Sequence, residues 1–223
     1  MTTMSPAPVP AVTTRSYRVP NAIILGRVVL AFVACALLVQ GSVRAALAAV
    51  VLTGIAIAMD ALDGFAARRM GLGSKLGAVL DITADRVVEQ VYWITFAVAD
   101  LVPLWVALVI VTRSVLVDAV RGLALVHGRT AFGDSTMARS GLSHFLTASR
   151  AMRNLYGVAK VSAFMLLGIV VAVRAGLGAP GARALETAAT VAVSATVALC
   201  IARGLPVLLE ARAYLALPEP AEV

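Results

Sequence analysis

The sequence predicts an all-α integral membrane protein whose six transmembrane helices form one bundle. Its 223 residues are 61% hydrophobic and only 14% charged, and the mean hydropathy is +0.93. A soluble domain carries about 25% charged residues, so this composition excludes an ordinary soluble fold. Apolar runs recur along the chain, each long enough to cross ~30 Å of hydrocarbon as a helix that rises ~1.5 Å per residue. Lys and Arg concentrate in alternate connections between these runs.

The apolar runs divide the chain into its predicted elements. Gly and Pro residues, including Gly41, Pro103 and Pro180, mark the connections between them. The connection 128–152 mixes Ser, Thr and Gly with scattered Leu and Phe, which predicts a short interfacial helix rather than a span. The six predicted spans are approximately 20–41, 43–66, 77–99, 101–127, 153–174 and 184–211. The predicted organisation is a flexible N-terminal tail at 1–18, one six-helix membrane domain at 19–213 and a C-terminal tail at 214–223.

The positive charges predict how the bundle is oriented. Residues such as Arg68 and Arg129 fall on the side shared by both termini, whereas the opposite side carries only Arg44, Arg174 and Arg183. Because Lys and Arg favour cytoplasmic loops, we expect a multi-pass protein of the cell membrane with both termini cytoplasmic. The formal net charge is +7. In so apolar a chain this excess favours anionic lipid headgroups and phosphate substrates as partners over nucleic acid.

Aromatic residues gather around the turn at Asp100, on the side of the bundle that carries few positive charges. Tyr92 and Trp93 precede this turn and Trp105 follows it. Because Trp and Tyr favour the membrane–water interface, these residues predict an aromatic belt on the outer face.

Four aspartates lie in the stretch from the end of the second span to the third. Charge within a bilayer is costly, so Asp60, Asp63, Asp81 and Asp85 indicate a functional site. Their spacings of three and four residues place each pair on one face of a helix. Two antiparallel helices with a short connection would bring the two faces together, and the carboxylates would then repel one another without a cation. Hard divalent ions such as Mg²⁺, Mn²⁺ or Ca²⁺ suit these all-oxygen ligands, and two ions can share the four groups.

The residues between the two aspartate pairs favour a phosphate substrate over a simple cation site. Gly64 and Gly77 each lie one helical turn from a carboxylate, which leaves room for a large group to approach the backbone. Arg68 and Lys75 supply a guanidinium and an ammonium group that bind phosphate oxygens. A metal ion together with an arginine is typical of sites that carry out phosphoryl transfer.

These residues form a pattern that resembles the signature of the CDP-alcohol phosphotransferase (CDP-alcohol phosphatidyltransferase) family. The pattern reads Asp60-x2-Asp63-Gly64-x2-Ala67-Arg68-x8-Gly77-x3-Asp81-x3-Asp85. The resemblance implies six transmembrane helices, a homodimer and a site that opens to the cytoplasm. These implications agree with the span count and the charge bias.

The resemblance also implies roles for individual residues. Asp60, Asp63 and Asp81 would hold divalent metal, Mg²⁺ or Mn²⁺ in two sites, and Asp85 would be both a metal-side carboxylate and the base for the acceptor hydroxyl. The alcohol oxygen would attack the lipid-linked phosphorus of a CDP-lipid such as CDP-diacylglycerol, with release of CMP. The cytidine diphosphate pocket would be lined by Gly64, Ala67, Arg68 and Gly77.

The alcohol acceptor is indicated by other residues. The Pro-Asn pair that ends at Asn21, with Arg27 six residues later, resembles the phosphatidylglycerophosphate synthase branch of the family and makes Asn21 a binding candidate. Arg27 is either part of a site or an interface anchor. Arg113 and Arg121 lie two helical turns apart and can bind the phosphate of an anionic acceptor, or they snorkel or pair with Asp118. Glycerol 3-phosphate fits this chemistry.

Two further alternatives are open at this point. The stretch 129–160 does not match the phosphatidylglycerophosphate synthase branch, which leaves inositol phosphate, another polyol phosphate or phosphatidylglycerol as acceptors. Intramembrane carboxylates also suit an ion-coupled transporter. The transporter is disfavoured because the aspartates cluster toward the cytoplasmic ends beside Gly and Arg, and the sequence has no second acidic cluster across the bilayer.

Overall fold

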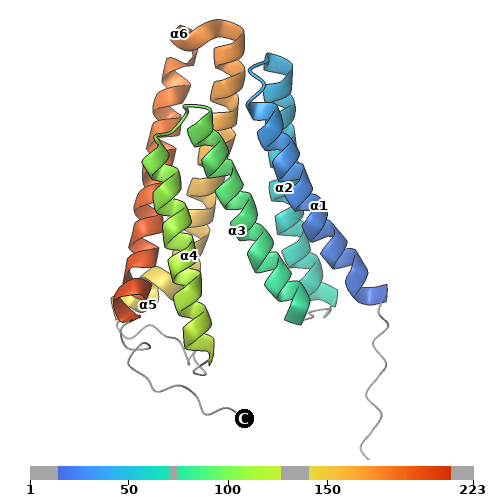
Figure 1. Ribbon diagram of the computed structural model, residues 1–223, viewed down its shortest axis with the longest axis vertical. Helices are drawn as coiled ribbons and strands as arrows, with labels where there is room; N and C mark the ends of the chain where they lie inside the picture. Colours follow the sequence, from blue (N-terminus) through green and yellow to red (C-terminus); the bar gives the residue numbers. More distant parts are fainter. Residues whose placement is uncertain (1–14, 71–74, 127–140, 212–223) are drawn as a thin grey trace, which may run out of the picture.

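The computed structural model is all-helical, as the sequence predicts (Figure 1). It describes residues 15–70, 75–126 and 141–211, and within these ranges the side chains of 15–20 and 61–76 and a few others are not described. The predicted tails therefore lie largely outside the described residues. The helices are α1 (Arg15–Leu38), α2 (Val43–Met70), α3 (Lys75–Val98), α4 (Leu104–Val126), α5 (Gly141–Ala148) and α6 (Arg150–Glu210).

The helix α6 is broken in its middle, where the sequence predicts a connection between two spans. Gly178 has φ 72° and ψ 176°, a conformation that glycine adopts without the penalty that a side chain would bring. The chain reverses there, so the two halves of α6 lie side by side as a helical hairpin (Figure 1). Each half then behaves as a separate helix in the packing of the bundle.

Within the described residues, four stretches are long and apolar enough to cross a membrane. They are Asn21–Leu38, Val43–Asp60, Arg150–Gly178 and Ala182–Glu210. Helices α3 and α4 have similar lengths of 24 and 23 residues but carry several ionisable residues. The six-span count and the cytoplasmic position of the termini therefore stay predictions.

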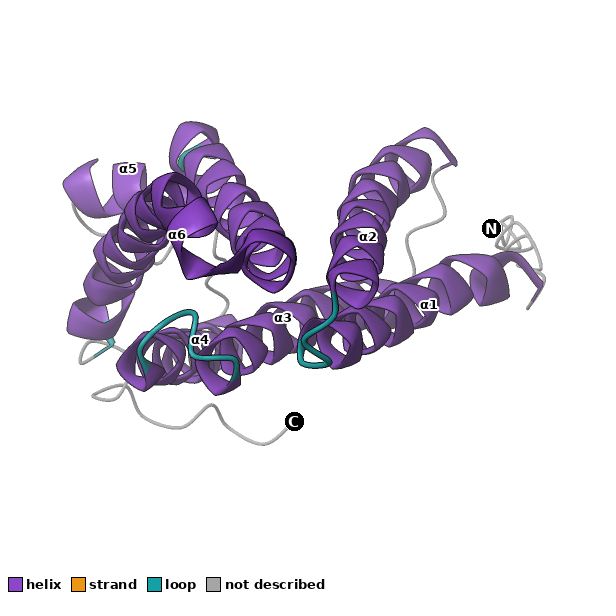
Figure 2. Ribbon diagram, turned by 90° about the horizontal axis from the view of Figure 1, so that it is seen from above, coloured by secondary structure: helices purple, strands orange, loops and turns teal. Residues whose placement is uncertain are grey.

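The bundle has two layers when it is seen from above (Figure 2). Helices α1, α3 and α4 form one row, while α2 and the two halves of α6 form the other. Helix α1 packs against both α2 and α3, and α4 packs against α3 and α6. This arrangement places α1 where it can reach the charged residues of both α2 and α3.

The short helix predicted within 128–152 is present as α5, which packs against α6. The hydroxyl of Ser149 caps the following helix, because its Oγ accepts a hydrogen bond from the backbone N–H of Met152 at 3.2 Å. Residues 127–140 of the same connection lie outside the described residues.

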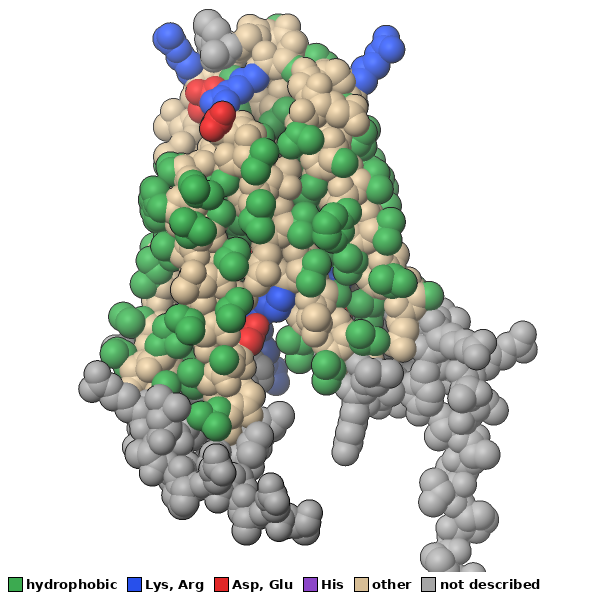
Figure 3. Space-filling view, in the orientation of Figure 1, with side chains coloured by type: hydrophobic (Ala, Val, Ile, Leu, Met, Phe, Trp, Pro, Cys, Tyr) green, Lys and Arg blue, Asp and Glu red, His purple; other side chains and the backbone are tan. Residues whose placement is uncertain are grey.

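The outside of the bundle is apolar, as expected for a surface that faces lipid. Hydrophobic side chains cover its flanks, whereas charged side chains appear at the upper end and in a recess lower between the helices (Figure 3). Leu25, Val51, Leu108, Val158 and Leu209 are each more than half exposed. Such extensive apolar exposure would be unfavourable in water.

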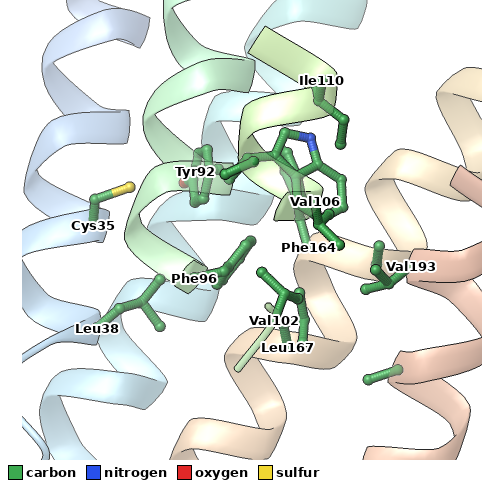
Figure 4. Close-up of a cluster of buried hydrophobic side chains, with 14 of the residues drawn as sticks. Cys35, Leu38, Tyr92, Phe96, Val102, Val106, Ile110, Phe164, Leu167 and Val193 are labelled. Atoms are coloured by element: carbon green, nitrogen blue, oxygen red, sulfur yellow. The ribbon is translucent and has the colours of Figure 1, made fainter. Parts of the chain in front are cut away.

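The core contains a cluster of aromatic rings that joins α3 to the first half of α6 (Figure 4). The Tyr92 ring stacks on Phe164 with 4.8 Å between centroids, and Trp93 meets the same ring edge-on at 5.2 Å. Tyr92 and Trp93 are 1% and 0% exposed, so the prediction that they belong to an aromatic belt is wrong. They lie on the face of α3 that packs inward, and only Trp105 is exposed as predicted.

Candidate active site

Three of the four predicted metal ligands meet in space. Asp60 of α2 and Asp81 and Asp85 of α3 each offer a carboxylate oxygen, and these oxygens lie within 4.8 Å of one another. We call these three residues the carboxylate cluster. Their side chains are 52%, 48% and 49% exposed, so ions and phosphates can reach them. The α3 pair shares one helical face because the two residues are four apart.

Arg27 of α1 lies in the middle of the carboxylate cluster. Its Nη1 pairs with Asp60, and its Nη2 lies 2.7 Å from Oδ1 of Asp85 and 3.4 Å from Oδ1 of Asp81. The arginine side chain is only 3% exposed and pairs with carboxylates inside the bundle, so it does not act as an anchor at the membrane interface. One guanidinium offsets part of the charge of three carboxylates, and the net charge of the group is still negative. Sequence reasoning left the role of Arg27 open because its partners lie on other helices.

The donor set of the carboxylate cluster fits a hard divalent cation. The converging atoms are all carboxylate oxygens, they lie within 4.8 Å of one another, and about half of each side chain is accessible. Asp63, the fourth predicted ligand, lies on α2, but its side chain is outside the described part of the chain.

The predicted nucleotide-binding residues are placed only in part. Gly77 is half-buried in the first turn of α3. Asn21 is half-buried near the start of α1, and no hydrogen bond or ion pair among the described residues joins it to the carboxylate cluster. The other predicted binding residues lie on α2 and α3, but their side chains are not described: Gly64, Ala67, Arg68 and Lys75.

A cavity opens beside the carboxylate cluster and extends toward the aromatic core. Asp60 and Asp85 line one part of it, and the hydroxyls of Thr53 and Tyr92, which share a hydrogen bond of 2.7 Å, line another. The remaining lining residues are Arg27, Ala56, Ile57, Val88, Glu89, Lys160, Val161 and Phe164. The cavity therefore places polar and charged groups deeper in the bundle than the carboxylates.

A second concentration of charge has the opposite sign. It brings together Arg86 of α3, Arg113 and Arg121 of α4 and Arg203 of α6, and we call it the arginine cluster. The guanidinium of Arg121 is repelled by the other three and attracted by Asp118. Arg113 and Arg121, which the sequence predicts as binding residues for the acceptor's phosphate, thus both belong to this cluster.

Close packing supports the arginine cluster. A Cβ atom at Gly204 would lie 2.6 Å from Nε and 2.7 Å from Cγ of Arg113, so only glycine leaves room for this side chain. The Nε atoms of Arg113, Arg121 and Arg203 are buried and have no hydrogen-bond partner among the described residues. Like charges held together with unsatisfied donors are suited to an anion.

Asp118 forms its ion pair with Arg86, whose Nε lies 2.9 Å from Oδ2 of Asp118. Asp118 also attracts Arg121 of its own helix, so it interacts with arginines of two helices. Arg86 and Arg203 were missed as candidates, although the first directly follows Asp85 and the second is an arginine inside an apolar run.

Comparison with known proteins decides the family. The family model described as CDP-alcohol phosphatidyltransferase matches residues 17–215. The chain belongs to the CDP-alcohol phosphatidyltransferase family. The resemblance carried by the aspartate pattern is thereby confirmed, and the membrane location of the helical bundle agrees with this membrane-embedded family.

Individual relatives fall into two kinds of CDP-alcohol phosphatidyltransferase. The chain is 31% identical over 115 residues to human cardiolipin synthase (CMP-forming), which covers 51% of this chain and 37% of the relative. The rat protein of the same name is 34% identical over 104 residues, 46% of this chain and 33% of the relative. CDP-diacylglycerol–glycerol-3-phosphate 3-phosphatidyltransferase of Bacillus subtilis is 38% identical over 80 residues, 36% of this chain and 40% of the relative. The matched parts thus span well under half of each relative.

Proposed function

We propose that this protein transfers the phosphatidyl group of a CDP-linked lipid, such as CDP-diacylglycerol, to the hydroxyl of a small phosphorylated alcohol and releases CMP. The observation that carries the proposal is the pairing of a carboxylate cluster with an arginine cluster in one bundle. The first group suits a metal-bound pyrophosphate, and the second suits an acceptor that carries its own phosphate. Such a reaction belongs to phospholipid biosynthesis.

The carboxylates hold the metal ions in this proposal. Asp60, Asp63, Asp81 and Asp85 would bind Mg²⁺ or Mn²⁺ in two sites. When bound, these ions neutralise the pyrophosphate and stabilise the departing CMP. Arg68, Gly64, Ala67 and Gly77 would contact the cytidine diphosphate, as the family pattern implies.

Asp85 is the base in this proposal. The acceptor oxygen forms a bond to the lipid-linked phosphorus, the bond from that phosphorus to CMP breaks, and the hydroxyl proton passes to the Asp85 carboxylate. The contact between Asp85 and Arg27 uses Oδ1, so Oδ2 is the atom that can face the hydroxyl. Arg27 thus orients the base, and the cavity beside Asp85 gives the acceptor a place to enter.

The acceptor that fits best is glycerol 3-phosphate. A phosphate monoester carries about −1.5 to −2 charges near neutral pH, which the grouped guanidinium groups can match. The name of the Bacillus subtilis relative supports this acceptor. The human and rat relatives are named cardiolipin synthases, and phosphatidylglycerol is the second candidate. Inositol phosphate and other polyol phosphates share the monoester chemistry.

The proposed arrangement in the membrane has six spans, both termini and the active site on the cytoplasmic side, and two chains in a homodimer. The positive charge bias of the connections and the family pattern support this arrangement. Family membership also favours the transferase over an ion-coupled transporter.

The experiment that tests the proposed function measures CMP release by purified protein. The protein is incubated with CDP-diacylglycerol, Mg²⁺ or Mn²⁺, and in turn glycerol 3-phosphate, inositol phosphate and phosphatidylglycerol. We expect the fastest release with glycerol 3-phosphate and a phosphatidylglycerophosphate product detected by mass spectrometry. Absence of CMP with every acceptor would contradict the reaction class, and a clear preference for another acceptor would replace glycerol 3-phosphate.

A further inference from the structure

Glu89 is a buried acid that the proposed reaction does not use. It lies one helical turn after Asp85 on α3, and its side chain is only 5% exposed. Three groups surround its carboxylate: the hydroxyl of Tyr156 donates to Oε1, Nζ of Lys160 lies 3.4 Å from Oε2, and Nη1 of Arg86 lies 3.7 Å from Oε2. A carboxylate without partners at this depth would be strongly unfavourable, so these contacts determine its position.

Glu89 lies between the two charged clusters. Glu89 and Lys160 line the same cavity as Asp60 and Asp85. On its other side Arg86 belongs to the arginine cluster and also contacts Asp118 of α4. A chain of ion pairs thus runs from α6 through α3 to α4, in the order Lys160, Glu89, Arg86 and Asp118.

The charges explain why a carboxylate is needed at this position. Lys160 and Arg86 are both cationic, and Arg86 is already close to other arginines. Without Glu89 these cations would repel one another, and Lys160 would lose the only carboxylate that contacts it among the described residues. The Tyr156 hydroxyl occupies one oxygen of Glu89, which leaves the other to hold both cations.

We propose that Glu89 is a positioning residue for the acceptor, because it holds Lys160 on the cavity wall and Arg86 in the arginine cluster, where the two cations meet the acceptor's phosphate while its hydroxyl faces Asp85. This inference rests on the proposed function. It predicts that Glu89 sets the affinity for phosphorylated alcohols and leaves binding of the CDP-lipid unchanged. Lys160 is then the cation that extends acceptor binding from the arginine cluster into the cavity.

The test is Glu89→Gln, which keeps the shape of the side chain and removes its charge. Initial rates of CMP release are measured against glycerol 3-phosphate and, separately, against CDP-diacylglycerol. We expect KM for glycerol 3-phosphate to rise about tenfold or more, as for loss of a charged hydrogen-bonding partner, while KM for CDP-diacylglycerol changes less than about twofold. A merely structural role would alter both constants together.

Two companion variants sharpen the result. Tyr156→Phe keeps the charges of Glu89 and Lys160 but removes the hydroxyl that donates to Glu89. We expect KM for glycerol 3-phosphate alone to rise, by about two- to fivefold. If Glu89→Gln fails to fold, Tyr156→Phe takes its place in the test. The double variant Glu89→Gln with Lys160→Met should be little worse than Glu89→Gln alone, because both changes remove the same cation from the cavity wall. The matched control is Glu186→Gln, which breaks the 2.7 Å ion pair with Arg174 away from the site and should leave both KM values unchanged.

Three results would overturn the inference: an unchanged KM for glycerol 3-phosphate in Glu89→Gln, an equal rise in both KM values, or a lower kcat with both KM values unchanged. Failure of the proposed function is a different result, since the wild-type protein would then release no CMP. In that case sulfate replaces the acceptor phosphate as the probe. The inference predicts that sulfate raises the unfolding temperature of the wild type more than that of Glu89→Gln, and equal protection would refute it.

Discussion

The carboxylate cluster and the arginine cluster differ in the sign of their charge and in how deeply their charged groups are buried. The first keeps its acids about half exposed and places one buried arginine, Arg27, among them. The second buries the Nε atoms of Arg113, Arg121 and Arg203, and its fourth member, Arg86, forms an ion pair with Asp118. The first group therefore attracts cations, and the second attracts anions. Under the proposed function, the donor's pyrophosphate with its metal would bind at the carboxylate cluster, and the acceptor's phosphate would bind at the arginine cluster.

The largest effect should come from removing the base within the carboxylate cluster. We expect Asp85→Asn to lower kcat for CMP release by about 10²- to 10⁴-fold, because the acceptor hydroxyl loses the group that takes its proton. The unfolding temperature of the detergent-purified variant checks that the fold is retained. Activity near the wild-type level would remove Asp85 from the mechanism.

Loss of a guanidinium group from the arginine cluster should weaken binding of the acceptor. Arg121→Gln removes one of its guanidinium groups, and we expect KM for glycerol 3-phosphate to rise about 10- to 100-fold while KM for CDP-diacylglycerol stays within about twofold. Steady-state kinetics with each substrate varied in turn measure this split. If both constants rise alike, the arginine cluster does not separate acceptor from donor. Arg174→Gln, at an ion pair away from the site, is the matched control.

Arg27 tests how the carboxylate cluster balances its charge. Arg27→Gln leaves three carboxylates without their internal cation, so we expect a lower unfolding temperature in the presence of a chelator. Added Mn²⁺ should then raise the unfolding temperature more in the variant than in the wild type, because the ion offsets more repulsion. If Mn²⁺ raises the unfolding temperature of the variant by the same amount as that of the wild type, or by less, Arg27 does not offset the repulsion between the three carboxylates.

The smallest effect concerns the packing that supports the arginine cluster. Gly204→Ala places a methyl group where Arg113 lies, so the arginine must shift, and we expect KM for glycerol 3-phosphate to rise a few-fold. Gly122→Ala on α4 is the control, because a Cβ built at that position has no atom within 4 Å apart from those of its own helical backbone and its chain neighbours. Alanine should stabilise that helix by about 1 kcal/mol and leave the kinetics unchanged. Equal kinetics in both variants would show that the position of Arg113 is not important for the acceptor.

The sequence by itself determined the membrane character, the helical class and the family. Composition and the length of the apolar runs are sufficient for the first two, because a bilayer imposes a span length and requires backbone hydrogen bonds to be satisfied within helices. The spacing of Asp81 and Asp85 also places both on one face, because the helical period relates residues four apart. These are properties of single segments, so they can be predicted without knowing how the segments pack.

Only the tertiary structure decided which groups from different helices meet. Arg27 and Asp85 are 58 residues apart, and Glu89 and Tyr156 are 67 residues apart, yet each pair is in contact. Helical periodicity tells which residues share a face, but it does not tell which neighbouring helix that face contacts. For the same reason Tyr92 could be taken for an interfacial residue although it is buried against Phe164. The packing of α1 against α3, and the side-chain contacts between α3 and α6, settle which groups meet. The internal partners of both charged clusters depend on them.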